Sequence, residues 1–377
     1  MKIISFEYHD ERQPGWNYTP ITLNAINLFV GETGSGKTKL LNTLFDIGVF
    51  VAQGHLYKGG KWEIIFEGEE AKYKWNYDGE INNEGVGRIV KEEVVKIAFD
   101  GTETTIISRG DDFIYKGHQL PKLVSGLCSI YLLKEEPIIE DLYQAFLKIL
   151  RRSFSDDALK QSLAYSSIPD MINKELMTKK SLETLSTKNE LNLSLKLYFL
   201  KKYFKSLYDD LIGFYKSIFP AIDHCDVKEF ASVPDLSISP HKVPIFCIRE
   251  KNVHGEILLH NLSAGMQKVL LIMTDIISLP RNSLYLIDEY ENSLGINAID
   301  FLPSFLADHG INKQFIITTH HPYLINNMPI VNWQIFHRNG SNVTIKCGGE
   351  YVEKFGHSKQ KAFIQLINDP FYTKGLR

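Results

Sequence analysis

The hydrophobic pattern divides the chain into regions with different expected secondary structure. Residues 1–30 read as strands, because they are rich in β-branched and aromatic residues on either side of a Pro-Gly turn. After a glycine-rich loop, residues 37–52 carry apolar positions at helical spacing. Residues 60–118 alternate short strand-like runs with turn pairs of the Asp-Gly type, which predicts an antiparallel β-subdomain.

Helical and alternating patterns fill the second half. Residues 138–220 repeat apolar positions at i, i+3 and i+4 without sustained heptads, so we expect packed helices and no long coiled-coil arm. Residues 262–346 alternate helices with apolar strands, which predicts a mostly parallel sheet. The fold class is therefore α/β, with a mostly parallel core sheet, an antiparallel β-subdomain and an inserted helical lobe. The expected lobes are 1–137 (N-terminal), 138–224 (helical) and 225–377 (C-terminal).

Composition narrows the class of protein. Of the 377 residues, 44% are apolar and 23% charged, which is ordinary for a globular chain and excludes disordered or collagen-like structure. The net charge of −3 excludes a generally basic nucleic-acid-coating protein, although a local basic face stays open. The four cysteines form no CxxC pair, so we expect free thiols. No apolar run has membrane-spanning length and the N-terminus is too charged for a signal peptide, so we expect a cytoplasmic protein without membrane contact.

The sharpest motif is the glycine-rich loop between a strand and a helix. It matches GxxxxGK[ST] in full, with Gly31, Glu32, Thr33, Gly34, Ser35, Gly36, Lys37 and Thr38. Such a loop turns successive backbone N–H groups, and the positive end of the following helix, toward a chain of phosphates. Lys37 is expected to reach the β- and γ-phosphates and Thr38 to ligate Mg²⁺.

A second motif places two carboxylates at a strand end. Residues 284–287 are apolar, and Asp288 and Glu289 follow them. Asp288 suits the ligand shell of Mg²⁺, and Glu289 is placed to orient or deprotonate an attacking water. Any core strand can end in acids, so this prediction depends on the phosphate-binding loop upstream.

Two further signals are weaker by themselves. Ser263 reads as the N-cap of a mostly apolar helix with Gly265 in its first turn, which fits phosphate binding or an ordinary capped core helix. His320 follows a threonine pair at a strand end, where it fits a γ-phosphate contact or a structural role. Their order and spacing relative to the paired carboxylates strengthen both signals: Ser263 precedes Asp288 by 25 residues, and Asp288 precedes His320 by 32.

In this order, the motifs resemble those of the ABC-type ATPase superfamily. GETGSGKT is similar to Walker A, LSAGM to the signature, LYLIDE to Walker B, ENSLG to the D-loop and TTHHP to the switch region. LSAGM departs from the transporter form LSGGQ at Ala264 and Met266. DEYENSLG resembles the DExENxLH form of OLD-like ATPases, with Gly295 where histidine is usual, so the chain resembles the AAA15/AAA21 group. The resemblance covers about residues 1–50 and 225–340.

The resemblance implies an ATPase that needs ATP and Mg²⁺ and forms a homodimer or a higher even oligomer. Ser263 and Gly265 would act on the ATP held by the partner, while Glu289 and His320 would be catalytic in their own subunit. His320 is a better switch candidate than His321, which precedes Pro322 and is expected to face solvent. For the Q-loop glutamine, Gln53, Gln119 and Gln144 stay open.

The resemblance leaves alternative functions to weigh. A transporter ATPase fits poorly, because Lys37 and Ser263 are far apart in sequence. A RecF/SMC-like DNA repair ATPase that binds DNA is the main alternative. Too few residues follow His321 for a TOPRIM nuclease domain, and a non-hydrolysing scaffold would have lost one of the paired acids. The favoured interpretation is an OLD-like ATPase that senses or regulates for a separate effector, a nuclease or toxin, in bacterial anti-phage defence.

The helical lobe adds a lysine-rich stretch between Lys174 and Lys205. It holds eight lysines against three glutamates. This charge fits docking of nucleic acid or an acidic partner, or a solvated amphipathic helix with its aromatic residues in the core. The lysines are Lys174, Lys179, Lys180, Lys188, Lys196, Lys201, Lys202 and Lys205.

Overall fold

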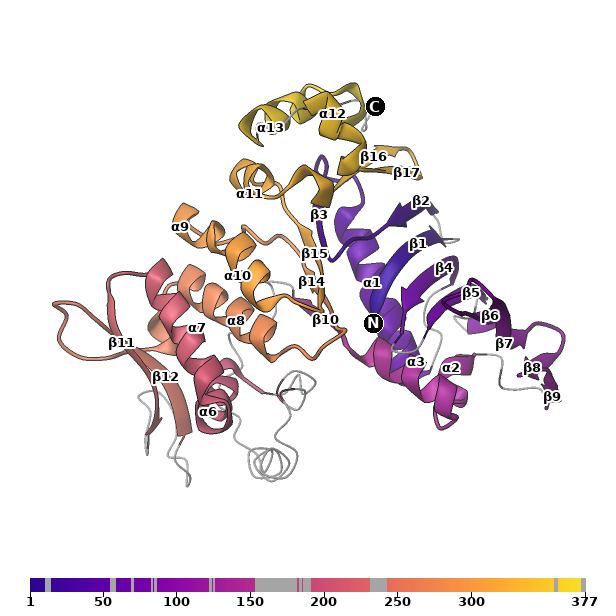
Figure 1. Cartoon of the computed structure of the whole chain (residues 1–377), viewed down its shortest axis with the longest axis horizontal. Helices are drawn as coiled ribbons and strands as arrows, with labels where there is room; N and C mark the ends of the chain where they lie inside the picture. Colours follow the sequence, from indigo (N-terminus) through magenta and orange to yellow (C-terminus); the bar gives the residue numbers. More distant parts are fainter. Residues whose placement is uncertain are drawn as a thin grey trace. The chain divides into compact units, whose positions relative to one another are not determined.

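A computed structural model of the chain resolves two compact units (Figure 1). The first unit comprises Met1–Arg152, Asn282–Tyr290 and Asn312–Arg377, and the second comprises Ser153–Arg281 and Glu291–Ile311. The three lobes drawn from the sequence stay a prediction. The structure describes residues 1–10, 15–54, 59–68, 71–82, 84, 87–121, 124, 126–152, 182, 185, 191–230, 243–355 and 359–373.

The first unit is built on one large sheet. In the described residues its strand order is β10-β14-β15-β3-β16-β17-β2-β1-β4-β5-β6-β7-β8-β9. The strands are β1 (Lys2–Asp10), β2 (Trp16–Thr22), β3 (Ile26–Val30), β4 (Gly60–Glu67), β5 (Lys72–Ile81), β6 (Gly87–Ile97), β7 (Glu103–Arg109), β8 (Phe113–Tyr115), β9 (His118–Leu120), β10 (Ile149–Arg152), β14 (Leu284–Ile287), β15 (Gln314–Thr318), β16 (Trp333–Asn339) and β17 (Asn342–Cys347).

Five neighbouring strands, β10, β14, β15, β3 and β16, run parallel. Every residue of β14 and β15 is buried, as continuous apolar runs in a parallel sheet require. Because parallel strands end at the same edge, the segments that follow β3, β14 and β15 meet there. This arrangement confirms the predicted α/β class with a mostly parallel core.

The predicted antiparallel region continues the same sheet instead of standing apart. β1 pairs with β4, and β4 to β9 then pair with one another as successive antiparallel neighbours. The alternating pattern of β5 turns Trp75 and Tyr77 inward, where Tyr77 stacks on Trp62 at 3.8 Å and Trp75 on Phe50 at 6.4 Å. Since Phe50 lies on α1, this cluster ties the antiparallel strands to the helix that begins at the glycine-rich loop.

Helices cover the sheet of the first unit. α1 packs against α3, α2 and β10 (Figure 1). The helices of this unit, within its described residues, are α1 (Lys37–Gln53), α2 (Ser129–Leu132), α3 (Pro137–Leu147), α11 (Pro322–Asn327), α12 (Val352–Phe355), α13 (Lys359–Ile367) and α14 (Pro370–Thr373), with 3-10 turns η2 (Ile330–Asn332) and η3 (Gly348–Tyr351).

The second unit surrounds one buried helix, α8 (Ala264–Ser278). Residues 268–278 are all buried, and α8 packs against α6, α7, α9 and α10. The antiparallel pairs β11–β12 and β12–β13 form the sheet of this unit. Its other elements are α6 (Leu193–Tyr203), α7 (Lys205–Ile218), β11 (Ile222–Phe230), β12 (Val243–Glu250), β13 (Ile257–Leu258), η1 (Leu259–Asn261), α9 (Ile296–Ile299) and α10 (Phe301–His309).

No helix in the described part of the chain combines the length and the apolar character that crossing a bilayer requires. The stretch 153–181, on which part of the helical-lobe prediction falls, lies outside the described residues.

Candidate nucleotide site

The glycine-rich loop connects the end of β3 to the start of α1. Gly36 is the N-cap of α1 and has φ +98°, in the left-handed region that favours glycine. A Cβ atom there would lie 2.8 Å from the Trp16 ring and 2.9 Å from the Tyr18 hydroxyl. That hydroxyl donates a 3.1 Å hydrogen bond to the Gly36 carbonyl. The loop therefore depends on glycine for both its backbone angle and its close approach to β2.

Lys37 lies inside the loop and is only 4% exposed. Its Nζ donates to the carbonyls of Gly31, at 2.7 Å, and Glu32, at 2.9 Å, and lies 3.3 Å from Ser35 Oγ. A buried ammonium needs such acceptors, because removing it from water is costly. These carbonyls hold the ammonium group at the loop, where it can also donate a hydrogen bond to an anionic ligand.

Thr38 and Asp288 bring oxygen atoms together at the edge of the sheet. The Thr38 hydroxyl donates to Asp288 Oδ1 at 3.0 Å, and the Thr318 hydroxyl donates to the same oxygen at 2.7 Å. Asp288 is 8% exposed. One carboxylate and hydroxyls suit Mg²⁺, which prefers oxygen ligands and keeps water or phosphate in its other positions. In the described residues, no group of three or more His, Cys, Asp and Glu side chains is placed to hold a metal ion.

Glu289 has an unusual backbone conformation, with φ +47° in the left-handed region. Its N–H donates to Thr318 Oγ1 at 2.8 Å, and the N–H of Tyr290 donates to the Thr318 carbonyl at 3.1 Å. Tyr290 is buried, whereas Glu289 is exposed. Left-handed backbone at a non-glycine residue is costly and marks functional sites. Thr318 thus holds the turn that separates the buried Asp288 from the exposed Glu289.

The two adjacent histidines differ in their surroundings. His320 is exposed and follows β15 at the same sheet edge as Asp288. His321 is half-buried and caps α11, where its Nδ1 accepts the N–H of Tyr323 at 3.3 Å. His321, which was expected to face solvent, is thus partly exposed and also makes a local contact as the cap of α11.

Sequence reasoning missed the residues that support the loop from outside. Arg338, on β16, donates to the Gly34 carbonyl at 3.1 Å, and its guanidinium lies 4.0 Å from the centre of the Trp16 ring. Lys39 pairs with the buried Asp10 at 2.8 Å. No local motif marks these residues, because each contact joins segments that are distant in sequence.

The second unit carries the other predicted residues. Ser263 caps α8, accepting the N–H of Met266 at 3.3 Å, so the N-cap prediction is confirmed. Gly265 lies in the first turn of α8 beneath the loop 291–295. The glycine-rich loop, Asp288, Glu289 and His320 belong to the first unit, and Ser263 and Gly265 to the second.

The three glutamines considered for the Q-loop are all exposed. Gln53 ends α1, at the opposite end from Lys37, Gln119 lies on β9, and Gln144 lies on α3. None of these positions is next to Asp288. A segment that does contact Asp288 is the end of β10, which pairs with β14: the carbonyl of Arg152, the last residue of β10, accepts the N–H of Asp288 at 3.1 Å. None of the three glutamines follows β10.

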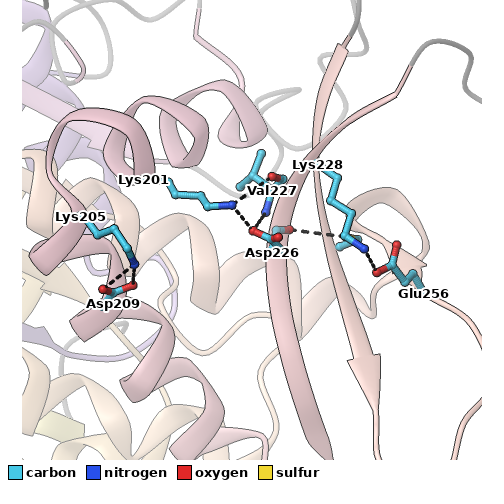
Figure 2. Close-up of polar contacts among 8 residues, drawn as sticks. Lys201, Lys205, Asp209, Asp226, Val227, Lys228 and Glu256 are labelled. Atoms are coloured by element: carbon cyan, nitrogen blue, oxygen red, sulfur yellow. Dashed lines mark hydrogen bonds and ion pairs between the residues drawn. The ribbon is translucent and has the colours of Figure 1, made fainter.

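In the lysine-rich stretch, three of the four lysines that the structure describes form ion pairs. Lys196 is 1% exposed and pairs with the equally buried Asp275 at 3.1 Å, so it cannot face a partner. Lys201 pairs with Asp226, and Lys205 with Asp209 (Figure 2). These pairs offset the charge of three lysines, whereas Lys202 is exposed, with its Nζ 5.6 Å from the centre of the Tyr198 ring and 5.3 Å from that of Tyr203. Lys174, Lys179, Lys180 and Lys188 lie outside the described residues.

Comparisons with known proteins add a family match. A family model described as "AAA domain, putative AbiEii toxin, Type IV TA system" matches residues 26–326. No curated protein matches the sequence.

Similar solved structures include an SMC head bound to the C-winged helix domain of ScpA, which has 11% identity and a TM-score of 0.48 and covers 92% of this chain and 97% of that one. The SMC head domain from Thermotoga maritima has 11% identity and a TM-score of 0.40, covering 92% and 99%. An Smc head with an extended coiled coil, bound to the C-terminal domain of ScpA derived from Pyrococcus furiosus, has 11% identity and a TM-score of 0.48, covering 94% and 98%.

Proposed function

Since the chain belongs to the AAA family of P-loop ATPases, in the ABC-type AAA15/AAA21 group, we propose that it hydrolyses ATP to ADP and phosphate with Mg²⁺. The observation that carries this proposal is the convergence of Thr38, Asp288 and Thr318 beside the lysine of the loop. Oxygen ligands for a metal and a cation for phosphates are the two parts that phosphoryl transfer to water needs most.

The roles follow from position. Lys37 binds the β- and γ-phosphates, replacing part of its contacts with the loop carbonyls. Thr38 and Asp288 hold Mg²⁺, which when bound neutralises charge on the phosphates. Glu289 is exposed beside Asp288, so its carboxylate orients the attacking water and accepts its proton. His320, exposed at the same edge, donates a hydrogen bond to the γ-phosphate or to that water.

We further propose that two chains close around ATP. The motifs divide between the two units: the loop and the carboxylates lie in the first, and Ser263 and Gly265 in the second. A capped helix N-terminus such as that of α8 favours an anion. In the dimer, the N-terminus of α8 would approach the γ-phosphate held by the partner, so that ATP joins the chains and hydrolysis releases them.

The biological role we propose is regulation of a separate effector, a nuclease or toxin, in anti-phage defence in the bacterial cytoplasm. The description of the matching family mentions a type IV toxin–antitoxin system, which supports a multi-component defence role. The paired lysines of α6 and α7 give no support to the alternative of a DNA repair ATPase that binds DNA there.

One experiment tests the core of this proposal. Phosphate release from Mg-ATP and the molar mass by light scattering are measured for the wild type, Glu289→Gln and Lys37→Ala. We expect turnover only in the wild type, and an ATP-dependent doubling of mass in Glu289→Gln but not in Lys37→Ala. No turnover by the folded wild type would contradict hydrolysis, and an unchanged mass of Glu289→Gln would contradict the dimer. The defence role is tested by phage plating with the neighbouring gene, comparing wild type with Glu289→Gln.

A further inference from the structure

The loop that follows the paired carboxylates, residues 291–295, rests directly on the first turn of α8. A Cβ atom added to Gly265 would lie 2.8 Å from the Ser293 carbonyl oxygen, so no larger residue fits there without displacing the loop backbone. Ser293 has φ +64°, and the Leu294 N–H donates to the Glu291 carbonyl at 3.0 Å. The loop is a tight turn pressed against α8.

Lys268 fastens this turn to the helix. It is 1% exposed, one turn beyond Gly265, and its Nζ donates to the carbonyl of Asn292. A buried ammonium is retained only where acceptors replace water, so its contact with the loop backbone is strongly favoured over exposure of either group. Lys268 and Gly265, three positions apart on α8, meet the carbonyls of the adjacent residues Asn292 and Ser293, the first through its charge and the second through close contact.

The rest of α8 is fixed independently of the loop. Ser263 caps its first turn, and Asp275 pairs with Lys196 of α6 in a buried ion pair further along. The Tyr215 hydroxyl of α7 also donates to the Met266 carbonyl at 3.2 Å. The helix is therefore a rigid base, and the loop gains its position from that base through Lys268.

We propose that Lys268 is a positioning residue that locks residues 291–295 to the N-terminal turn of α8, so that the loop and Ser263 approach a nucleotide as one rigid element. This inference rests on the proposed function, in which the α8 N-terminus meets the ATP of a second chain. Lys268 touches no reacting atom in this scheme; it sets where the loop lies when the two chains close.

The test compares Lys268→Met with Lys268→Arg and with Thr274→Val. Methionine keeps most of the length of the lysine side chain but lacks its charge, whereas arginine keeps a positive charge at this position. Thr274 is a buried α8 residue whose hydroxyl donates to the Leu270 carbonyl within the helix, so its variant controls for general disturbance of α8. Amide hydrogen exchange of residues 291–295, nucleotide affinity, kcat and KM are measured on the full chain.

In Lys268→Met, we expect faster exchange confined to residues 291–295, unchanged nucleotide affinity, and a fall in kcat of about 100-fold, because misplacing a positioned group by about 1 Å has effects of that size. Lys268→Arg should recover part of kcat, and Thr274→Val should behave as the wild type. Wild-type exchange in the loop of Lys268→Met would overturn the proposal. If the wild type itself does not hydrolyse ATP, the proposed function fails, while the exchange measurement still decides whether Lys268 holds the loop.

Discussion

The Thr38 hydroxyl lies 3.0 Å from Asp288 Oδ1, although 250 positions separate the two residues in the sequence. Thr38 lies in the first turn of α1, and Asp288 follows β14, so the parallel sheet brings both to its carboxyl edge. The fold by itself therefore brings their oxygen atoms together. Such preorganisation reduces the entropy lost when a metal and a nucleotide are bound.

Lys37→Ala should weaken ATP binding by about 100-fold, since a charged hydrogen bond to phosphate contributes about 3 kcal/mol. Calorimetric titration with ATP measures this. Lys61→Ala is the matched control, because Lys61 is an exposed lysine of β4 that pairs with Asp78 at 3.2 Å. Equal affinity of Lys37→Ala and the wild type would show that the loop is not the phosphate site.

Glu289→Gln should bind ATP normally and lose turnover by at least about 100-fold, the usual effect of removing a general base. The amide keeps the shape of the side chain but accepts a proton poorly. Because the left-handed turn at Glu289 is held by two backbone N–H groups, which donate to the hydroxyl and the carbonyl of Thr318, the fold should not change. Turnover at the wild-type rate would remove Glu289 from the mechanism.

Thr318→Val should lower kcat by about tenfold while leaving the affinity for ATP nearly unchanged. The change keeps the side-chain volume but removes the bond to Asp288 and the acceptor of the Glu289 N–H, and each lost bond costs about 1 kcal/mol. Thr319→Val is the comparison, since the Thr319 hydroxyl accepts only the His321 N–H, at 3.0 Å, among the contacts described. A similar loss of kcat in both variants would argue against a specific role for Thr318.

The local motifs singled out most of the residues that the structure brings to the carboxyl edge of the sheet. A glycine-rich loop between strand and helix has one common conformation, and buried strands that end in acids place them at the sheet edge. What sequence could not show were contacts made in three dimensions. Lys196 looks like any lysine in a basic stretch until Asp275 of α8 is found beside it, and Arg338 supports Gly34 from a strand that is distant in sequence.

The antiparallel region illustrates the same limit. Alternation predicted its strands, but not that β4 pairs with β1 and so extends the core sheet. Pairing between sheet regions depends on which edge stays open after the core has formed, and no local pattern in these strands encodes that choice.

Lys313→Met should stabilise the protein at pH 7 by about 3 kcal/mol, because burial lowers the pKa of Lys313 from 10.5 to about 8 and one pKa unit corresponds to about 1.4 kcal/mol. Between pH 8 and 10.5 the unfolded chain binds more protons than the folded one, so wild-type stability rises with pH across that window. The advantage of Lys313→Met is therefore full below pH 8 and disappears by about pH 10.5. Urea unfolding at several pH values measures this. Lys313→Arg keeps its charge over this pH range, so its stability should not rise with pH as that of the wild type does. An equal rise in the wild type, Lys313→Met and Lys313→Arg would show that Lys313 is not the group responsible.

The last prediction concerns the arrangement of the two chains. Ser263→Arg places a bulky cation at the N-terminus of α8, where the proposed dimer needs close approach to phosphate. It should leave ATP binding intact, because the loop lies in the first unit, and block ATP-dependent dimerisation. Neither Ser263→Arg nor Lys37→Ala should hydrolyse ATP alone.

A mixture of these two variants can still form one complete site, which pairs the intact loop of Ser263→Arg with the intact α8 of Lys37→Ala. We expect phosphate release from the mixture to recover to a fraction of the wild-type rate, measured at several mixing ratios with a maximum near equal amounts. A mixture of Lys37→Ala and Glu289→Gln is the control, because its heterodimer contains no site with both Lys37 and Glu289 intact, and it should stay inactive. If neither mixture is active while Glu289→Gln alone dimerises with ATP, the two sites must act together. If Ser263→Arg alone keeps full turnover, the N-terminus of α8 takes no part in the reaction.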